Sequence, residues 1–385
     1  MSIELGRGTG PLAGIKVVEI AGIGPGPHAC MLLADLGADV IRVERPGGAM
    51  SVTSREGDLL LRGRPSVALD LKHPRALETV LELVDDADVL IEGMRPGAAE
   101  RMGIGPDACL GRNPRLVYGR MTGWGQDGPW AQMAGHDMNY IGLTGILDGL
   151  GQDRGRPHFP ANLLGDFGGG SLYLVVGVLA ALLEAQRSGE GQVVDAAIVD
   201  GTAHLAAMTV AQLVEGALTE KRGRGLLDGG APFYDVYATS DGRHMSVGPL
   251  EPQFFAEFAR LLELPDDAPG QFELERWGEL RETLTRRFAE RTQAEWAGVF
   301  DGTDACVAPV LRFGEAVDHP HLTARGVYAP HEGLRQPAPA PRFSRTQASL
   351  TRNPGAVGAD TLAALRAWGV ESPEQLVAEG AAHQA

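Results

Sequence analysis

Residues 15–44 read IKVVEIAGIGPGPHACMLLADLGADVIRVE, and this stretch decides the fold class. Its first six residues are rich in β-branched side chains and predict a strand. A turn rich in glycine and proline follows, in which Pro27 suits the first position of a helix over residues 28–36. Residues 39–44 predict a second strand. The stretch is therefore a β–turn–α–β unit, and we expect it to begin an open α/β sheet.

The turn after the first predicted strand also resembles a dinucleotide-binding fingerprint. Gly22 and Gly24 follow the strand, and Glu44 lies about twenty residues further on, where an acid that binds ribose would lie. However, Pro27 occupies the third glycine position, and Arg45 follows Glu44 directly. Nucleotide-dependent hydride transfer is therefore only a minor alternative.

The composition limits the possible functions. The chain has 385 residues, 44% of them hydrophobic, which is enough for two domains with a large core. A formal net charge of −16 argues against general binding of nucleic acid or of an anionic membrane, but it leaves room for a local basic pocket. Cys30, Cys109 and Cys306 lie far apart without a CxxC motif, which favours a reducing cytoplasm over a disulfide framework.

Membrane and metal chemistry are not expected. The first ten residues are polar and rich in glycine, so they do not resemble a signal peptide. No uninterrupted apolar run has the length that a bilayer requires, and we therefore expect no membrane insertion. The ten histidines are scattered without HxxxH spacing, so the sequence predicts no metal site.

The expected large domain covers residues 1–220. Its last helix is predicted over residues 192–216. The charged, glycine-rich residues 220–230 lack apolar periodicity, and we place the domain boundary there.

The expected small α+β domain covers residues 230–320. It opens with a hairpin in which Asp241 and Gly242 form the turn. The proline-rich residues 337–341 then lead the chain back, so that residues 325–385 are expected to rejoin the large domain.

Four cations follow the predicted strands of the large domain or lie in the loops beyond them: Arg45, Lys72, Arg95 and Arg101. In open α/β sheets this edge faces the ligand crevice. Arginine binds phosphate in a bidentate manner and lysine binds it as a point charge, so the four could form a phosphate site. The alternative is a solvated surface, because acids slightly outnumber bases between residues 42 and 101.

Two polar residues further along are candidates for proton transfer. His136 supplies an imidazole, which exchanges a proton near neutral pH. Asp166 precedes the apolar residues 172–183, which read as a buried helix, and a carboxylate at a helix start lies beside free N–H groups. Such groups also stabilise an enolate oxygen. The alternatives are a histidine at a helix start or in the core, and an aspartate that caps the helix.

The segments around these two residues resemble a known family. Gly135-His136-Asp137-Met138-Asn139-Tyr140 and Asn162-Leu163-Leu164-Gly165-Asp166-Phe167 are similar to the two active-site segments of the α-methylacyl-CoA racemases, within the family III CoA-transferase fold group. The resemblance extends from about Gly10 to about Arg345. It implies an α/β fold with a Rossmann-like large domain and a smaller α+β domain, in an interlocked homodimer. It also implies an acyl-CoA thioester as substrate, with no cofactor besides the CoA that enters with it.

The resemblance further implies site residues. The catalytic set would be His136, Asp166 and Glu251, with Glu251 orienting the histidine from the small domain of the same or the other subunit. The CoA- and substrate-binding set would be Arg45, Leu69, Asp70, Leu71, Lys72, Arg95, Arg101, Gly135, Asp137, Met138, Asn139 and Tyr140. Asp137 is also expected to act as a cap or an internal partner. Glu251, before Pro252, has the alternative of a plain helix-start acid.

The implied reaction is epimerisation of 2-methylacyl-CoA thioesters. One base removes the α-proton, and the conjugate acid of a second base returns a proton to the opposite face. His136 and Asp166 would exchange these roles between the two directions. This requires a raised pKa at Asp166, which a dry apolar site can produce.

Two other functions remain open. A CoA-transferase would use Asp166 as a nucleophile, but would not need the second base His136, and its glycine-rich lid is interrupted here at residues 225–230. A non-catalytic acyl-CoA-binding protein would need neither residue. Met121, Met138 and Met245 are candidates for an acyl groove, with ordinary core positions as the alternative.

Overall fold

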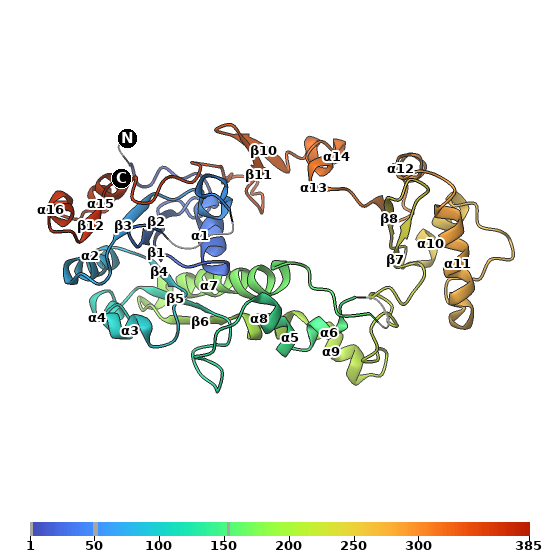
Figure 1. The fold of residues 1–385 in the computed structure, drawn as a ribbon, viewed down its shortest axis with the longest axis horizontal. Helices are drawn as coiled ribbons and strands as arrows, with labels where there is room; N and C mark the ends of the chain where they lie inside the picture. Colours follow the sequence, from blue (N-terminus) through green and yellow to red (C-terminus); the bar gives the residue numbers. More distant parts are fainter. Residues whose placement is uncertain (1–2, 49–52, 152–154) are drawn as a thin grey trace. The chain divides into compact units, whose positions relative to one another are not determined.

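The computed structural model describes residues 3–48, 53–151 and 155–385, and the chain divides into two compact units (Figure 1). The first comprises Met1–Thr144, Pro160–Leu205 and Ala324–Ala385. The second comprises Gly145–Phe159 and Ala206–Thr323. This division falls after Leu205, whereas the sequence predicts a boundary at residues 220–230. The helix that follows, α9 (Ala207–Val214), has no buried residue.

The first unit contains the expected open α/β sheet. Its seven strands have the order β12-β3-β2-β1-β4-β5-β6, and all neighbours are parallel except β12 with β3. The strands are β1 (Lys16–Ile20), β2 (Asp39–Glu44), β3 (Ser66–Leu69), β4 (Val89–Glu92), β5 (Val117–Thr122), β6 (Val193–Ala197) and β12 (Ala382–His383). Parallel strands end at the same edge, so the loops after β1 to β5 gather at the carboxyl edge of the sheet.

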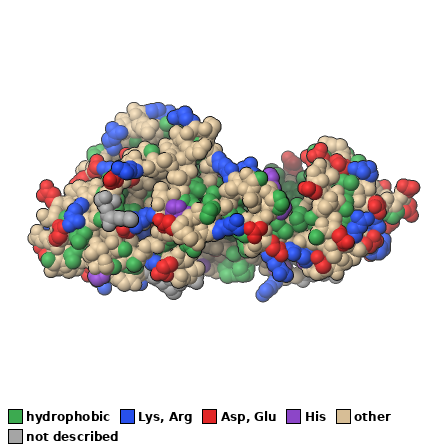
Figure 2. Space-filling view, turned by 90° about the horizontal axis from the view of Figure 1, so that it is seen from above, with side chains coloured by type: hydrophobic (Ala, Val, Ile, Leu, Met, Phe, Trp, Pro, Cys, Tyr) green, Lys and Arg blue, Asp and Glu red, His purple; other side chains and the backbone are tan. Residues whose placement is uncertain are grey.

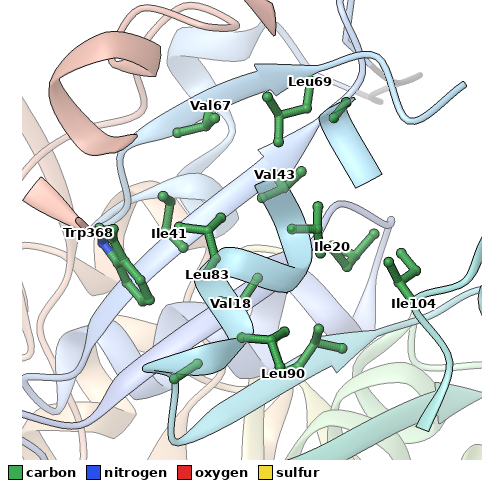
Figure 3. Close-up of a cluster of buried hydrophobic side chains, with 14 of the residues drawn as sticks. Val18, Ile20, Ile41, Val43, Val67, Leu69, Leu83, Leu90, Ile104 and Trp368 are labelled. Atoms are coloured by element: carbon green, nitrogen blue, oxygen red, sulfur yellow. The ribbon is translucent and has the colours of Figure 1, made fainter. Parts of the chain in front are cut away.

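Helices cover both faces of this sheet (Figure 1). Along β4, Leu90 points to one core, and Val89 and Ile91 point to the other, as the two-residue period of a strand requires. The first core, drawn in Figure 3, is covered by α2 (Pro74–Asp85), α3 (Ala98–Met102), α4 (Pro106–Arg112) and α15 (Thr361–Ala367). The second is covered by α1 (Pro25–Asp35) and α7 (Leu172–Ser188).

The predicted elements differ from the structure in several places. Residues 193–197 form β6, where we expected a helix, because β-branched side chains complete the edge beside β5; the helix α8 (Ile198–Leu205) follows. Helix α1 begins at Pro25, two residues before the expected start. The sequence analysis also missed α5, α16 and three strands: α5 (Asp137–Leu143), α16 (Pro373–Ala378), the hairpin β10 (Tyr328–His331) with β11 (Leu334–Pro337), and β12.

The segment before α7 is the most unexpected element. Residues Leu163–Ser171 form a π-helix that continues into α7, so Asp166 lies inside a helical segment and does not cap α7. Together they give a 26-residue helix, Leu163–Ser188, which by length and composition could cross a membrane. The sequence analysis considered only uninterrupted apolar runs, and this helix is interrupted by Asp166, Glu184 and Arg187. In the structure α7 packs on β5 and β6 as a sheet-covering helix.

The second unit has a sheet of its own. Strands β7 (Asp235–Ala238) and β8 (His244–Val247) form the predicted hairpin, and β9 (Val307–Pro309) pairs with β8. Helices α10 (Pro252–Leu261), α11 (Trp277–Phe288) and α12 (Gln293–Phe300) supply most of the core. The shorter helices of this unit are α6 (Ile146–Gly149), α9, α13 (Phe313–Ala316) and α14 (Pro320–Ala324).

Candidate active site

The carboxyl group of Asp166 lies at the carboxyl edge of the large sheet. A Cβ built on Gly24, in the turn after β1, would be 3.1 Å from the Asp166 Oδ2. Gly24 has a φ of +67°, so glycine suits both this backbone and the close approach. Between β1 and β4 the strand order reverses, and open α/β sheets bind their ligands at such switch points.

Asp137 holds the Asp166 segment in place. Its Oδ1 accepts a hydrogen bond of 2.6 Å from the Asp166 backbone N–H, and the Gly165 N–H also points to this carboxylate. The side chain is 6% exposed, and burial raises its pKa. A Cβ on Gly165 would lie 2.5 Å from the Asp137 Oδ1. Glycine at position 165 therefore permits the contact that joins α5 to the π-helix.

The Asp166 carboxyl itself has few partners. The Asn162 side chain donates to its Oδ2 at 3.3 Å. Burial raises the pKa of Asp166 to about 6, and the neighbouring Asp137 charge adds to this, while the Asn162 bond and His136 act in the opposite direction. The carboxyl group can therefore hold or release a proton near neutral pH.

His136 is the N-cap residue of α5, directly before Asp137. Its backbone N–H donates to the Asn139 Oδ1 at 3.0 Å, which fixes the helix start. Its side chain is exposed, and its charge acts to lower the pKa of Asp166. Asp137, the next residue, accepts the Asp166 backbone N–H and so joins the segment that carries His136 to the segment that carries Asp166.

Tyr140 anchors the other side of this turn. Its hydroxyl donates to the Gly135 carbonyl, and its ring packs edge-to-face on Trp124 at 4.7 Å. Glycine is required at position 123, where a Cβ would lie 2.1 Å from the Tyr140 ring. Tyr140 is 8% exposed and its side chain packs in the core, so it stabilises the segment that carries His136.

The predicted CoA-binding cations lie at the expected edge. Arg45, Lys72, Arg95 and Arg101 are all exposed, and none forms an ion pair within the part of the chain that the structure describes. Figure 2 shows one face of the protein, on which basic and acidic side chains are interspersed.

The neighbouring predicted contacts differ in access. Leu69 is 0% exposed, packs in the core and pairs with Ala382 in the sheet, so neither its side chain nor its backbone is accessible to a ligand. Leu71 is half-buried against the same core, and the Asp70 Oδ1 accepts the Lys72 backbone N–H at 3.1 Å.

Of the three methionines suggested for an acyl groove, one is available. Met121 and Met245 are buried in the cores of the two units. Met138, beside His136 in the sequence, is 43% exposed. Met138 is therefore the methionine of the three that a ligand can contact.

Glu251 belongs to the second unit. It precedes α10 as the N-cap residue, in the position of a helix-start acid. Its expected partnership with His136 stays a prediction. In the same unit the interrupted glycine-rich loop is closed on itself, because the Asp228 carboxylate accepts the N–H groups of Gly223, Gly225 and Gly230 at 2.8–3.1 Å.

The sequence analysis assigned no role to two contacts of Asp166. Asn162 stood in the quoted segment, and its spacing of four residues from Asp166 was a usable signal on a helical segment. Gly24 appeared only as part of a nucleotide fingerprint. Gly24 lies near Asp166 because of tertiary packing, which no local sequence pattern reports.

Comparison with known proteins places the chain in a family. The model of CoA-transferase family III matches residues 12–361. The chain belongs to CoA-transferase family III. Alpha-methylacyl-CoA racemase of Mus musculus is 44% identical over 369 residues, covering 95% of each protein. The human alpha-methylacyl-CoA racemase is 44% identical over 347 residues, covering 89% of this chain and 90% of that protein.

Other members of CoA-transferase family III are more distant. Succinyl-CoA:glutarate CoA-transferase of Mus musculus is 29% identical and covers 91% of this chain and 85% of that protein. Among solved structures, a CAIB/BAIF family protein from Brucella suis matches with a TM-score of 0.82 and 27% identity, over 94% of this chain and all of that chain. The mixed α/β fold is thus shared across the family.

Proposed function

We propose that this protein epimerises 2-methylacyl-CoA thioesters, in either direction, by two-base proton transfer through an enolate. The observation that carries the proposal is the pair of proton-transfer groups at the sheet edge, His136 and Asp166, with Asp166 held in a half-buried site that raises its pKa to about 6. The 44% identity to two alpha-methylacyl-CoA racemases supports the same reaction.

The chemistry needs one proton on the pair. When His136 is neutral and Asp166 is protonated, His136 removes the α-proton, the thioester carbonyl becomes an enolate oxygen, and Asp166 protonates the opposite face of the carbon. The product state has the proton on His136 and the carboxylate on Asp166, which is the starting state for the reverse reaction. With a pKa of about 6, the Asp166 carboxyl is present in both its protonated and its ionised form near neutral pH.

The remaining groups would bind and orient the substrate. The exposed cations Arg45, Lys72, Arg95 and Arg101 supply charge for the CoA phosphates. Glu251 would support the protonated imidazole, from its own subunit or from a second one. The proposed reaction uses no metal or redox cofactor, since the thioester carbonyl accepts the electron pair of the broken C–H bond.

The second candidate is CoA transfer. Asp166 could attack a thioester to form an acyl anhydride and then carry CoA. The similarity to succinyl-CoA:glutarate CoA-transferase supports this second candidate. This route gives no task to His136. The presence of His136, on a segment joined to that of Asp166 through Asp137, therefore favours proton transfer.

Proton NMR in D2O separates the two reactions. An (R)-2-methylacyl-CoA is incubated with the protein, with and without a carboxylic acid acceptor. Epimerisation predicts loss of the α-proton signal and formation of the other epimer without the acceptor. A new thioester that forms only with the acceptor, while the α-proton is retained, would overturn the proposal in favour of the transferase.

The same assay tests the two residues. His136→Ala and Asp166→Ala should abolish turnover and retain CoA affinity, measured by calorimetry. If turnover survives both changes, the two-base mechanism is wrong.

A further inference from the structure

His28 contacts the segment that carries Asp166. It lies in the first turn of α1, and its ring stacks on Phe167 with centroids 4.3 Å apart and an interplanar angle of 18°. Its Nδ1 is 2.6 Å from the Ser171 Oγ. Phe167 directly follows Asp166, and Ser171 ends the π-helix. Neither the proposed reaction nor the family resemblance assigns a role to this histidine.

The hydrogen-bond pattern fixes the state of the ring. The Ser171 hydroxyl has one hydrogen, and it donates to the Phe167 carbonyl at 3.0 Å, because that carbonyl can only accept. The contact with His28 therefore requires a hydrogen on Nδ1. Burial, together with the charges of Arg62 and Arg64, lowers the pKa of His28 to about 4, so the ring is neutral at pH 7. His28 thus acts as a fixed hydrogen-bond donor.

The contacts continue from His28 to Asp166 through one turn of α1. The His28 backbone N–H donates to the Gly24 carbonyl at 3.2 Å, and Gly24 is the residue against which the Asp166 carboxyl lies. The first turn of α1 therefore contacts two consecutive residues of the π-helix, Asp166 through Gly24 and Phe167 through His28. Beneath it, Arg64 donates to the Pro27 carbonyl at 3.0 Å and to Glu19 at 2.8 Å, which makes this turn a rigid support.

A π-helical turn needs such support. Its hydrogen bonds are less favourable than those of an α-helix, and single π-turns occur mostly at functional sites. The Phe167 carbonyl accepts both the Leu172 N–H and the Ser171 hydroxyl, so the wide turn is held at this carbonyl. Loss of the support would let the segment relax toward α-helix, and this would rotate Asp166 away from Gly24.

We propose that His28 is a positioning residue for Asp166: by holding Phe167 and Ser171, it fixes the π-helical turn that presents the Asp166 carboxyl at the end of β1. This inference rests on the proposed function, because Asp166 is taken as a proton-transfer group. The groups that face the Asp166 carboxyl are His136, Asp137, Asn162 and the Gly24 backbone, and none of them is altered by a change at position 28.

The test uses three variants that divide the contacts of His28. His28→Phe keeps a stacked ring and removes the donor. His28→Asn keeps a donor and removes the ring. Ser171→Ala removes the acceptor from the other side. Each is expected to lower kcat at least tenfold and to change KM less than twofold, because the acid–base group moves while the CoA-binding groups do not.

The pH profile distinguishes positioning from a general structural role. In the direction in which Asp166 is the base, wild-type kcat/KM should fall below about pH 6, where Asp166 takes up its proton. In the variants, a more hydrated Asp166 should shift this limb to lower pH by at least half a unit. The effects of His28→Phe and Ser171→Ala should be less than additive when combined, since both remove the contact between His28 and Ser171, while Ser171→Ala also removes the bond to the Phe167 carbonyl.

His204→Phe is the matched control. It removes a similar contact between a histidine and a hydroxyl, the 2.7 Å contact of His204 Nδ1 with Tyr173, on the neighbouring helices α7 and α8. This variant should leave the acid limb unchanged. If the His28 and Ser171 variants melt at lower temperature and lose activity while their acid limb stays at the wild-type pH, the proposal is wrong. If the wild type exchanges no α-proton at all, the proposed function has failed, which is a separate outcome.

Discussion

Two carboxylates share the candidate site, and their surroundings give them different tasks. Asp137 is buried and accepts backbone N–H groups, so its carboxylate holds the π-helix against α5. Asp166 has one side-chain donor at 3.3 Å and space beside Gly24, so its charge is available to a substrate. The aspartate with the fewer hydrogen bonds is therefore the one suited to exchange a proton.

Replacement of Asp166 should make stability depend less on pH. Burial raises its pKa to about 6, above that of a carboxyl group in the unfolded chain, so the folded state holds the extra proton between about pH 4 and 6. Stability from this group is thus present below that window and falls as pH rises through it, by about 3 kcal/mol. Asp166→Asn should raise the melting temperature more at pH 7.5 than at pH 4.5. Equal shifts at both pH values would contradict the raised pKa.

Asp137 should be more sensitive to truncation than to neutralisation. Asp137→Ala leaves the N–H groups of Asp166 and Gly165 without their acceptor, which should cost about 3 kcal/mol and abolish turnover. Asp137→Asn keeps a carbonyl oxygen and should cost less than half as much. Urea unfolding and the α-proton exchange assay measure the two effects. Equal losses in both variants would show that the charge, and not the acceptor, is what matters.

At the scale of elements, glycines allow the π-helix to approach its neighbours. A Cβ on Gly169 would lie 2.3 Å from the Thr202 Oγ1 on α8, and a Cβ on Gly201 would lie 1.9 Å from the Gly169 carbonyl oxygen. The two helices are therefore in backbone contact. The same packing holds Asp166 between α5 on one side and α1 on the other.

Two Gly→Ala substitutions should change stability in opposite directions. Gly169→Ala must separate the π-helix from α8 and should cost about 3 kcal/mol. Gly298→Ala, on the exposed side of α12, meets no atom within 4 Å and should gain up to about 1 kcal/mol from helix propensity. Chemical denaturation of both variants gives the comparison. A stable, fully active Gly169→Ala protein would refute the close-contact argument.

Periodicity explains which elements the sequence predicts. The strands β1 and β2 are predicted correctly because both have a short run of β-branched residues between turn signals. β6 has a comparable run, but helix-forming residues follow it directly, so its pattern reads as part of a helix. The π-turn at Leu163–Ser171 has no periodic signature, because it depends on contacts with α1, α5 and α8.

The same limits apply to the site. The resemblance supplied His136 and Asp166, and the structure joins their two segments through Asp137. The sequence could not show that Leu69 and Tyr140 direct their side chains into the core, because both residue types are also common in binding sites. The support from His28 depends on residues 143 positions apart in the chain, a separation that no local pattern reports.

For the whole molecule, we predict a homodimer. On α7 the apolar side chains of Leu172, Val176 and Leu183 are 47–65% exposed, which is unusual for a helix of a monomer. Sedimentation equilibrium should give twice the 40.7 kDa of one chain. Val176→Glu should shift the mass toward one chain, whereas Gly298→Ala should not. A monomeric wild type would contradict the prediction.

The C-terminal residues should be required for a stable sheet. β12 pairs with β3, and the Thr361 hydroxyl donates to the His383 carbonyl at 2.6 Å. Deletion of residues 382–385 should lower the melting temperature and cause aggregation that depends on concentration, because β3 becomes an open edge. His383→Ala keeps the backbone bonds and should behave as the wild type in light scattering. A fully stable deletion variant would refute this role.

The pairing of β12 with β3 also sets a condition on biosynthesis. Residues 68 and 69 leave the ribosome more than 300 residues before their partners at positions 382 and 383. While the intervening chain is translated, β3 remains an unpaired edge that can pair with another nascent copy. Cells that make this protein quickly should therefore depend on chaperones that cover this edge until β12 emerges.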